Sequence, residues 1–160
     1  MMNITIIALG KLKEKYLRDA VDEYAKRISA YGKLDIIELN PVKFSDNPSQ
    51  NEITSALSKE ADEIKKKIPN GSYIFTLCIE GKEKSSEAFA KAINDAALNG
   101  KSHITFIIGS SYGLSPEIKN LSDFKLSFSP MTFPHQLMRV MLLEQVYRAF
   151  QINNNGKYHK

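Results

Sequence analysis

Short apolar runs and amphipathic stretches alternate along the whole chain. Five runs rich in Ile, Leu and Phe predict β-strands, and between them apolar residues return every three or four positions, which is typical of helices with one buried face. The predicted strands cover residues 3–9, 34–39, 72–80, 103–109 and 123–129. The predicted helices cover residues 13–31, 52–68, 85–98 and 135–152, with a short one that begins at Pro116 behind an N-cap Ser115. This alternation predicts an α/β fold with a mainly parallel sheet flanked by helices.

The connecting segments hold most of the turn-forming residues. Gly32 ends the first helical pattern, and residues 40–51 contain two prolines and predict a loop. The tail 153–160, NNNGKYHK, has the composition of a disordered end. Its Tyr158 and His159 are nevertheless side chains that stack on bases and exchange protons near neutral pH. Both interpretations of the tail stay open at this point.

The last predicted helix has an unusual distribution of polar residues. On a helical wheel, the arc that is polar in its first half is apolar in its second half. The polar residues of the first half are His135, Gln136 and Arg139. A helix packed on one core keeps one apolar stripe, so we expect two bodies to contact this helix, and the simplest second body is another copy of the chain.

Composition limits the classes of protein that are possible. The 160 residues, 42% hydrophobic and 25% charged, suit one domain spanning 1–160. The net charge of +4 favours an acidic partner such as nucleic acid, although many proteins without that role share it. The single Cys78 and three scattered histidines offer no disulfide and no zinc spacing, and no apolar run could cross a bilayer. We therefore expect a cytoplasmic protein without metal or membrane attachment.

Ligands of open α/β sheets bind beyond the carboxyl ends of the strands, where three loops follow predicted strands here. The first loop, EGKEKSS, lacks the spacing of a P-loop, and the second, GSSYGLSP, lacks that of a Rossmann fingerprint. The glycines Gly109 and Gly113 of the second loop let backbone approach a ligand. The third loop, SPMTFP, is stiffened by two prolines, and its Met131 and Phe133 either contact a flat apolar ligand or close the end of the core.

Four stretches together resemble one family. They are GKLKEKY near the start, FIIGSSYGL, FPHQLMRVMLLEQVYRAFQI and the terminal YHK. They closely resemble the RlmH family of large-subunit ribosomal RNA methyltransferases, of the SPOUT class, in order and over the full length. The resemblance implies a C-terminal trefoil knot, a homodimer, and S-adenosylmethionine as cofactor. The implied activity is methylation of ring nitrogen 3 of a pseudouridine in 23S ribosomal RNA, with the assembled ribosome as the expected substrate.

The resemblance also implies roles for particular residues. The cofactor is expected at Leu77, Gly109, Phe128, Ser129, Pro130, Met131, Thr132 and Phe133. The substrate side is expected at Glu144, Arg148, Tyr158 and His159, with the tail crossing from the partner subunit. His159 or Glu144 would remove the proton from the ring nitrogen, and Arg148 would stabilise the anion.

Contacts to RNA phosphates are expected from Lys11, Lys13 and Lys15, unless these lysines are only a solvated helix start. Two other functions remain possible from the residues alone. One is a flavodoxin-like nucleotide-binding module without chemistry, and the other is a factor that binds ribosomes without transferring a methyl group.

Overall fold

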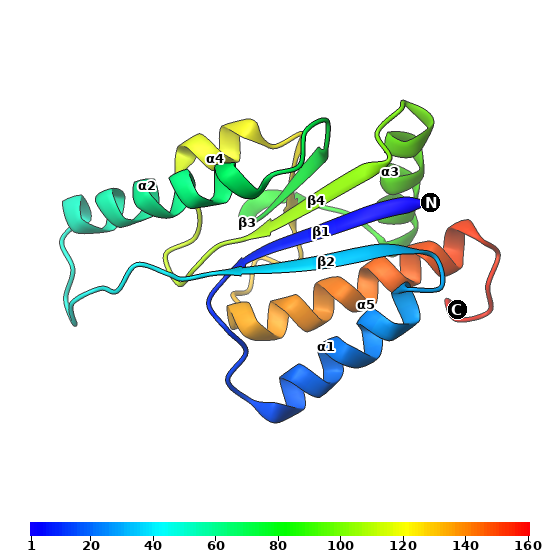
Figure 1. Ribbon diagram of the computed structural model, residues 1–160, viewed down its shortest axis with the longest axis horizontal. Helices are drawn as coiled ribbons and strands as arrows, with labels where there is room; N and C mark the ends of the chain where they lie inside the picture. Colours follow the sequence, from blue (N-terminus) through cyan, green and yellow to red (C-terminus); the bar gives the residue numbers. More distant parts are fainter.

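A computed structural model describes residues 1–160 as one parallel sheet of five strands in the order β2-β1-β4-β3-β5, flanked by five helices (Figure 1). The strands are β1 (Met2–Leu9), β2 (Gly32–Leu39), β3 (Tyr73–Glu83), β4 (His103–Ile108) and β5 (Phe124–Ser127). The helices are α1 (Lys15–Ile28), α2 (Gln50–Lys67), α3 (Ser86–Leu98), α4 (Pro116–Leu121) and α5 (His135–Asn153). Every strand pair is parallel, so the predicted α/β fold is confirmed.

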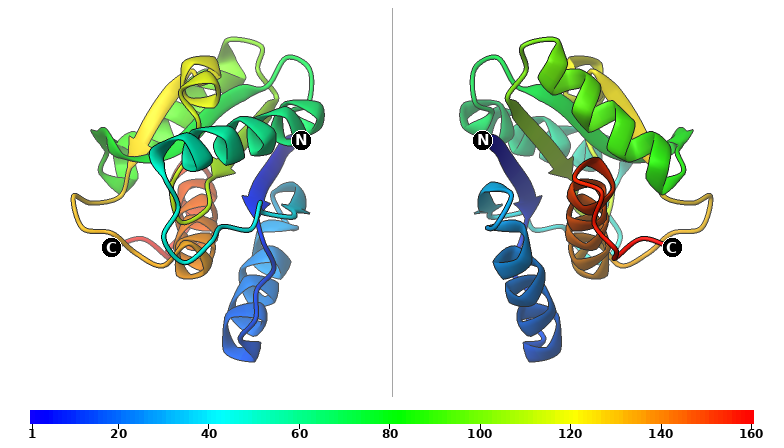
Figure 2. Two further views of the ribbon diagram at one scale, coloured as in Figure 1. Left: turned by 90° about the vertical axis from the view of Figure 1, so that its left-hand side faces the viewer. Right: turned by 90° about the vertical axis from the view of Figure 1, so that its right-hand side faces the viewer.

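Two helical layers cover the sheet. Helices α1, α3 and α5 lie on one face, with α5 between the other two, and α2 and α4 lie on the opposite face (Figures 1 and 2). The interior strand β1 contributes side chains to the cores on both faces of the sheet, because successive side chains of a strand point to opposite faces. Ile4 and Ile6 belong to the larger core under α5, whereas Ile7 and Leu9 belong to the smaller core under α2. Burial on both faces explains why the central strands are continuously apolar.

Helix α5 carries a single buried stripe from Arg139 to Gln151. Buried positions return every three or four residues, and they are Arg139, Leu142, Leu143, Val146, Ala149, Phe150 and Gln151. The prediction that the buried side changes halfway is therefore wrong, because it placed Arg139 on an exposed polar arc. The Arg139 side chain is only 2% exposed, and it pairs with Glu38 at 2.5 Å and donates to the Gly10 carbonyl at 3.1 Å.

Two boundary predictions are also wrong. Helix α1 ends at Ile28, and Gly32 is the first residue of β2 instead of a helix terminator. A Cβ at position 32 would lie 2.5 Å from the Met2 carbonyl oxygen, so glycine is needed for close pairing with β1. Strand β3 continues to Glu83, beyond the predicted end at residue 80, after a register shift between Leu77 and Lys82.

The tail beyond α5 folds back onto the molecule. The Gly156 amide donates to the Gln151 carbonyl at 2.7 Å, and Asn155 turns the chain with a φ of 56°. This turn directs Tyr158 and His159 toward α5, so the interpretation of the tail as a disordered end is wrong. None of the helices is both long enough and apolar enough to span a bilayer. The trefoil knot that the resemblance implies depends on how the loops after β4 and β5 pass each other, and it stays a prediction.

Candidate active site

A cavity of about 710 Å³ opens at the carboxyl ends of β3, β4 and β5. Three segments line most of it: residues 77–80, 108–114 and 128–135, with the exception of Pro130. Apart from Pro130, every residue predicted to bind the cofactor therefore lines one cavity. The three segments come together because the strands are parallel, so their carboxyl ends lie at the same edge of the sheet. The loop that follows each strand leaves the sheet at this edge.

The loop after β4 brings backbone to the cavity wall. Gly113 has a φ of +82°, and its amide donates to the Ser110 carbonyl at 2.8 Å, which closes a tight turn. A Cβ at Gly109 would lie 2.5 Å from the Gly113 carbonyl oxygen. Both glycines are thus required by the turn itself, and the result is a wall with little side-chain bulk.

The loop after β5 is held by its own serines. The Met131 amide donates to Ser129 Oγ at 3.0 Å, and the Ser127 hydroxyl donates to the Ser129 carbonyl at 3.2 Å. Met131 is 73% exposed, so the alternative that it closes the end of the core is wrong for this residue. Met131 and Phe133 instead form an apolar side of the cavity.

A second cavity, of about 460 Å³, adjoins the first. Leu126 and Phe128 line both cavities, and Glu144 and Gln145 of α5 line the second. Ser86 at the start of α3 lies opposite and donates to Gln145 Oε1 at 2.8 Å. The two cavities therefore meet at the side chains of β5 and of the loop that follows it.

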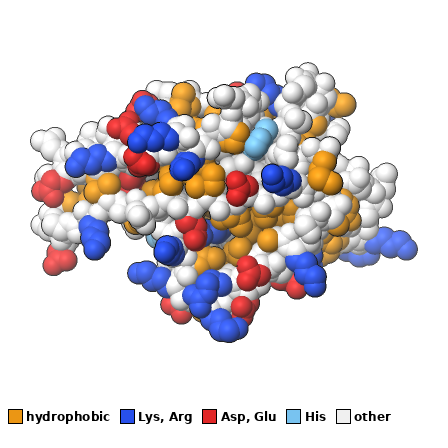
Figure 3. Space-filling model, viewed as in Figure 1, with side chains coloured by type: hydrophobic (Ala, Val, Ile, Leu, Met, Phe, Trp, Pro, Cys, Tyr) orange, Lys and Arg blue, Asp and Glu red, His pale blue; other side chains and the backbone are white.

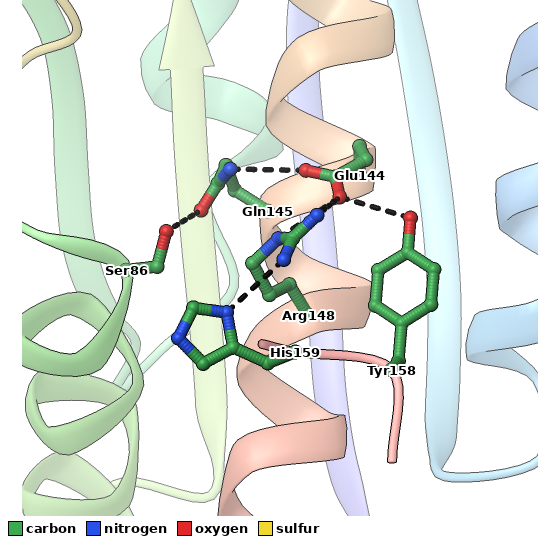
Figure 4. A network of polar contacts seen from close by, with 6 residues as sticks. All are labelled: Ser86, Glu144, Gln145, Arg148, Tyr158 and His159. Carbon is green, nitrogen blue, oxygen red and sulfur yellow. Dashed lines mark hydrogen bonds and ion pairs between the residues drawn. The ribbon is translucent and has the colours of Figure 1, made fainter. Parts of the chain in front are cut away.

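Glu144 is the acceptor on which the polar network of this second cavity converges (Figure 4). Its Oε1 accepts from Arg148 Nη2 at 2.6 Å, from Arg148 Nε at 3.0 Å and from the Tyr158 hydroxyl at 3.0 Å. Its Oε2 accepts from Gln145 Nε2 at 2.9 Å. The hydrogen bond to this carboxylate raises the pKa of Arg148. Two effects raise the pKa of Tyr158 to about 12: burial is the larger, and the hydrogen bond to Glu144 is the next.

His159 lies on the other side of the Arg148 guanidinium. Arg148 Nη1 is 3.0 Å from His159 Nδ1, and His159 Nε2 is 2.7 Å from Glu87 Oε1 (the first of these contacts is drawn in Figure 4). A guanidinium can only donate, so Nδ1 must accept and the imidazole proton lies on Nε2, where it is donated to Glu87. This contact from His159 lowers the pKa of Glu87.

The four residues predicted for the substrate side thus meet within a single chain. The tail reaches Glu144 and Arg148 of its own helix α5, and this differs from the crossing between subunits that the resemblance implied. Sequence reasoning missed Ser86, Glu87 and Gln145. Only Gln145 carried a signal, since it adjoins Glu144, whereas the two α3 residues are brought in by the packing of α3 against α5.

The first cavity also contains a charged pair that the sequence did not indicate. Glu80 on β3 and Lys119 on α4 form an ion pair of 2.5 Å at its wall, and this contact lowers the pKa of Glu80. Cys78 lies in the same wall, and its burial raises the pKa of the thiol. No three His, Cys, Asp or Glu side chains gather in a way that could hold a metal ion.

These features define the class of the protein: an α/β protein with a ligand cavity at its strand ends and an ionisable side-chain network beside it. The family follows from the sequence as a whole. A family model described as "Predicted SPOUT methyltransferase" matches residues 2–159, and the chain belongs to this family. The resemblance inferred from the four motifs is therefore confirmed, and the protein is a methyltransferase of the SPOUT class.

Individual relatives cover the chain almost completely. A Methanococcus maripaludis protein provisionally named ribosomal RNA large subunit methyltransferase H is 60% identical over 159 residues, which are 99% of this chain and 100% of the relative. The ribosomal RNA large subunit methyltransferase H of Clostridium novyi is 54% identical over the same shares of both chains. Among solved structures, a probable methylase family protein from Haemophilus influenzae matches with a TM-score of 0.53 at 14% identity. That match covers 99% of this chain and 70% of the other, and it supports the fold alone.

Proposed function

We propose that this protein transfers a methyl group from S-adenosylmethionine to ring nitrogen 3 of a pseudouridine in 23S ribosomal RNA, with the assembled ribosome as its substrate. The observation that carries the proposal is the pair of adjoining cavities that share Leu126 and Phe128. One cavity is lined by the expected cofactor residues except Pro130, and the other is lined in part by Glu144. The name shared by the relatives supports large-subunit ribosomal RNA as the substrate.

The first cavity suits the proposed cofactor. Its volume of about 710 Å³ lies in the range of cofactor pockets, and apolar side chains face a glycine-containing backbone wall. Leu77, Gly109 and the 128–133 loop would hold the cofactor, which supplies an electrophilic methyl group when it is bound. Glu80 and Lys119 add one negative and one positive charge to the wall. The amino-acid part of S-adenosylmethionine is zwitterionic, so its two charges complement this pair.

The polar network suits the removal of a proton from the target base. Glu144 already accepts hydrogen bonds from Arg148, Tyr158 and Gln145, so both of its carboxylate oxygens are occupied by donors of the protein. His159 Nδ1 is an unprotonated nitrogen held only by Arg148. We therefore favour His159 as the base that removes the proton from the ring nitrogen. The incoming ring would displace the Arg148 guanidinium from His159 Nδ1, and Arg148 would then stabilise the anion that forms on the ring.

Positive charge is scattered over one face of the molecule. On the face shown in Figure 3, lysines and arginines are interspersed with acidic side chains and form no continuous basic stripe. Lys15 pairs with Asp19 at 2.6 Å, so Lys11 and Lys13 are the better candidates for phosphate contacts. Shape and base contacts would then contribute more to recognition than the overall field, as expected for a folded RNA target.

The decisive experiment is labelled methyl transfer to assembled ribosomes and to protein-free 23S ribosomal RNA, measured side by side. We expect incorporation on ribosomes, with the methyl group on a pseudouridine by mass spectrometry of the digested nucleosides. Ribosomes that carry uridine at the target position are the matched control and should stay unlabelled. Ribosome binding without any incorporation would instead favour an assembly factor. Absence of cofactor binding at submillimolar concentration would favour a nucleotide-binding module of another kind.

A further inference from the structure

Helix α2 carries a carboxylate in its buried face. Glu60 is only 4% exposed and lies between Ala56 and Ile64 on the side that faces the sheet. A buried carboxylate is costly unless donors satisfy it. Glu60 has two: the Val42 amide donates to its Oε2 and the Ser110 hydroxyl donates to its Oε1, each at 3.0 Å.

The two donors belong to segments far apart in the sequence. Val42 lies in the segment 40–49 between β2 and α2, and Ser110 lies in the loop after β4 that lines the first cavity. A second contact joins the same two segments, since the rings of Phe44 and Tyr112 lie 4.6 Å apart at 56°. Figure 1 shows the two segments meeting at one edge of the sheet.

We propose that Glu60 is a positioning residue of the cofactor site, which acts by holding the 109–113 loop through Ser110. Glu60, Val42 and Phe44 do not line the cavity, whereas Ser110 and Tyr112 do. The segment 40–49 thereby becomes an outer support of the cofactor wall. This inference rests on the proposed use of S-adenosylmethionine.

The physical reason lies in the loop itself. Gly109 and Gly113 give its backbone many accessible conformations in the free protein, and selecting one of them on binding lowers affinity. A hydrogen bond from Ser110 to a carboxylate anchored in a helix fixes the loop beforehand. Bonds to charged acceptors are stronger than neutral ones, so a single such link has a measurable effect on binding.

The test measures the dissociation constant of S-adenosylmethionine by calorimetry for the wild type, four test variants and one control variant. We expect Glu60→Ala to weaken binding about tenfold and Ser110→Ala about threefold. Glu60→Gln should recover most of the affinity, because its amide can accept from Val42 and donate to Ser110. If Glu60 acts through Ser110, the double variant Glu60→Ala/Ser110→Ala binds no more weakly than Glu60→Ala alone. Glu63→Gln, an exposed carboxylate on the same helix, is the matched control and should bind like the wild type.

Kinetics separate positioning from general loss of structure. A positioning role raises the KM for S-adenosylmethionine and leaves the KM for the RNA substrate unchanged. Equal affinity of wild type and Glu60→Ala, or effects of the two single variants that multiply in the double variant, would overturn the inference. Ser110→Ala removes only a partly exposed hydroxyl, so it keeps the test valid if Glu60→Ala does not fold. A wild-type protein that fails to bind the cofactor would refute the proposed function as well, whereas normal wild-type binding with unaffected variants refutes this inference alone.

Discussion

At the scale of single residues, Arg148 is the link between the two halves of the polar network. Its guanidinium donates to Glu144 on one side and to His159 Nδ1 on the other, and it lies 4.8 Å from the centre of the Tyr158 ring. The tail is thus held by a residue that would also have to meet the substrate. Binding of the target base must therefore rearrange contacts that the free protein makes with its own tail.

Replacement of the proposed base tests this arrangement directly. We expect His159→Ala to bind S-adenosylmethionine within about twofold of the wild type and to lower turnover by about 100-fold or more, as is usual when a general base is lost. His103→Ala is the matched control, since that histidine is bonded to Thr5 at the amino end of the strands, away from both cavities. Unchanged turnover of His159→Ala would remove His159 from the mechanism.

Tyr158 gives a pH dependence whose sign follows from its environment. Its pKa of about 12 lies above the ordinary value of 10.0, because burial and Glu144 favour the neutral phenol. The unfolded chain therefore loses this proton first, so the stabilisation is complete below pH 10 or so and is lost as the pH rises toward 12. We expect the melting temperature of the wild type to fall more between about pH 9 and pH 11 than that of Tyr158→Phe. The exposed Tyr16→Phe should follow the wild type, and parallel curves for wild type and Tyr158→Phe would contradict this assignment.

At the scale of elements, the sequence predicted what depends on local pattern. All five strands and all five helices were located from the sequence. Burial on one or both faces makes apolar residues recur at regular intervals, and this periodicity is visible in a single amino-acid sequence. The errors lie where a contact from elsewhere decides the outcome. Gly32 was assigned to the end of a helix because its closeness to Met2 depends on strand pairing, and Arg139 was assigned to a polar arc because Glu38 and Gly10 come from other elements.

The candidate site, too, could be predicted from the sequence only in part. The loops after β3, β4 and β5 could be located from strand ends alone, but the residue roles came from a family resemblance. The meeting of Glu144 with Tyr158 could not be inferred from pattern, since a tail rich in asparagine and glycine has no periodicity. Glu60 could have been suspected, because a carboxylate four residues before Ile64 interrupts an otherwise apolar stripe.

The start of α5 offers a test of stability at this scale. Arg139→Ala would leave the Gly10 carbonyl without its donor, would leave Glu38 unpaired and would open space beneath the helix. We expect the free energy of unfolding, measured in urea, to fall by about 2–4 kcal/mol. Lys15→Ala removes one partner of an exposed ion pair and should change the free energy of unfolding by less than about 0.5 kcal/mol. A loss as small as that of the control would mean that Arg139 contributes little beyond filling space.

At the scale of the whole molecule, the starts of α1 and α5 carry exposed apolar side chains. Leu137 is 38% exposed at the start of α5, Met131 is 73% exposed just before it, and Tyr16 is 69% exposed at the start of α1. The two helix starts are close together, because the Lys13 amide donates to Gln136 at 3.2 Å. Exposed apolar side chains in one region of the molecular surface are typical of a protein interface. We propose that a second copy covers them and that the working protein is a homodimer.

Light scattering at micromolar concentration tests this dimer, because its mass would be twice the 18.0 kDa of one chain. We expect Leu137→Asp to shift the mass toward that of one chain, since a charge placed in an apolar interface loses its hydration without gaining a partner. Leu98→Asp is the matched control: Leu98 is 77% exposed at the end of α3, and its variant should keep the mass of the wild type. Met131 also lines the first cavity, so a dimer that covers Met131 would stiffen the cofactor loop. Leu137→Asp should then bind S-adenosylmethionine more weakly than Leu98→Asp does, whereas a wild-type mass of one chain would refute both the dimer and this coupling.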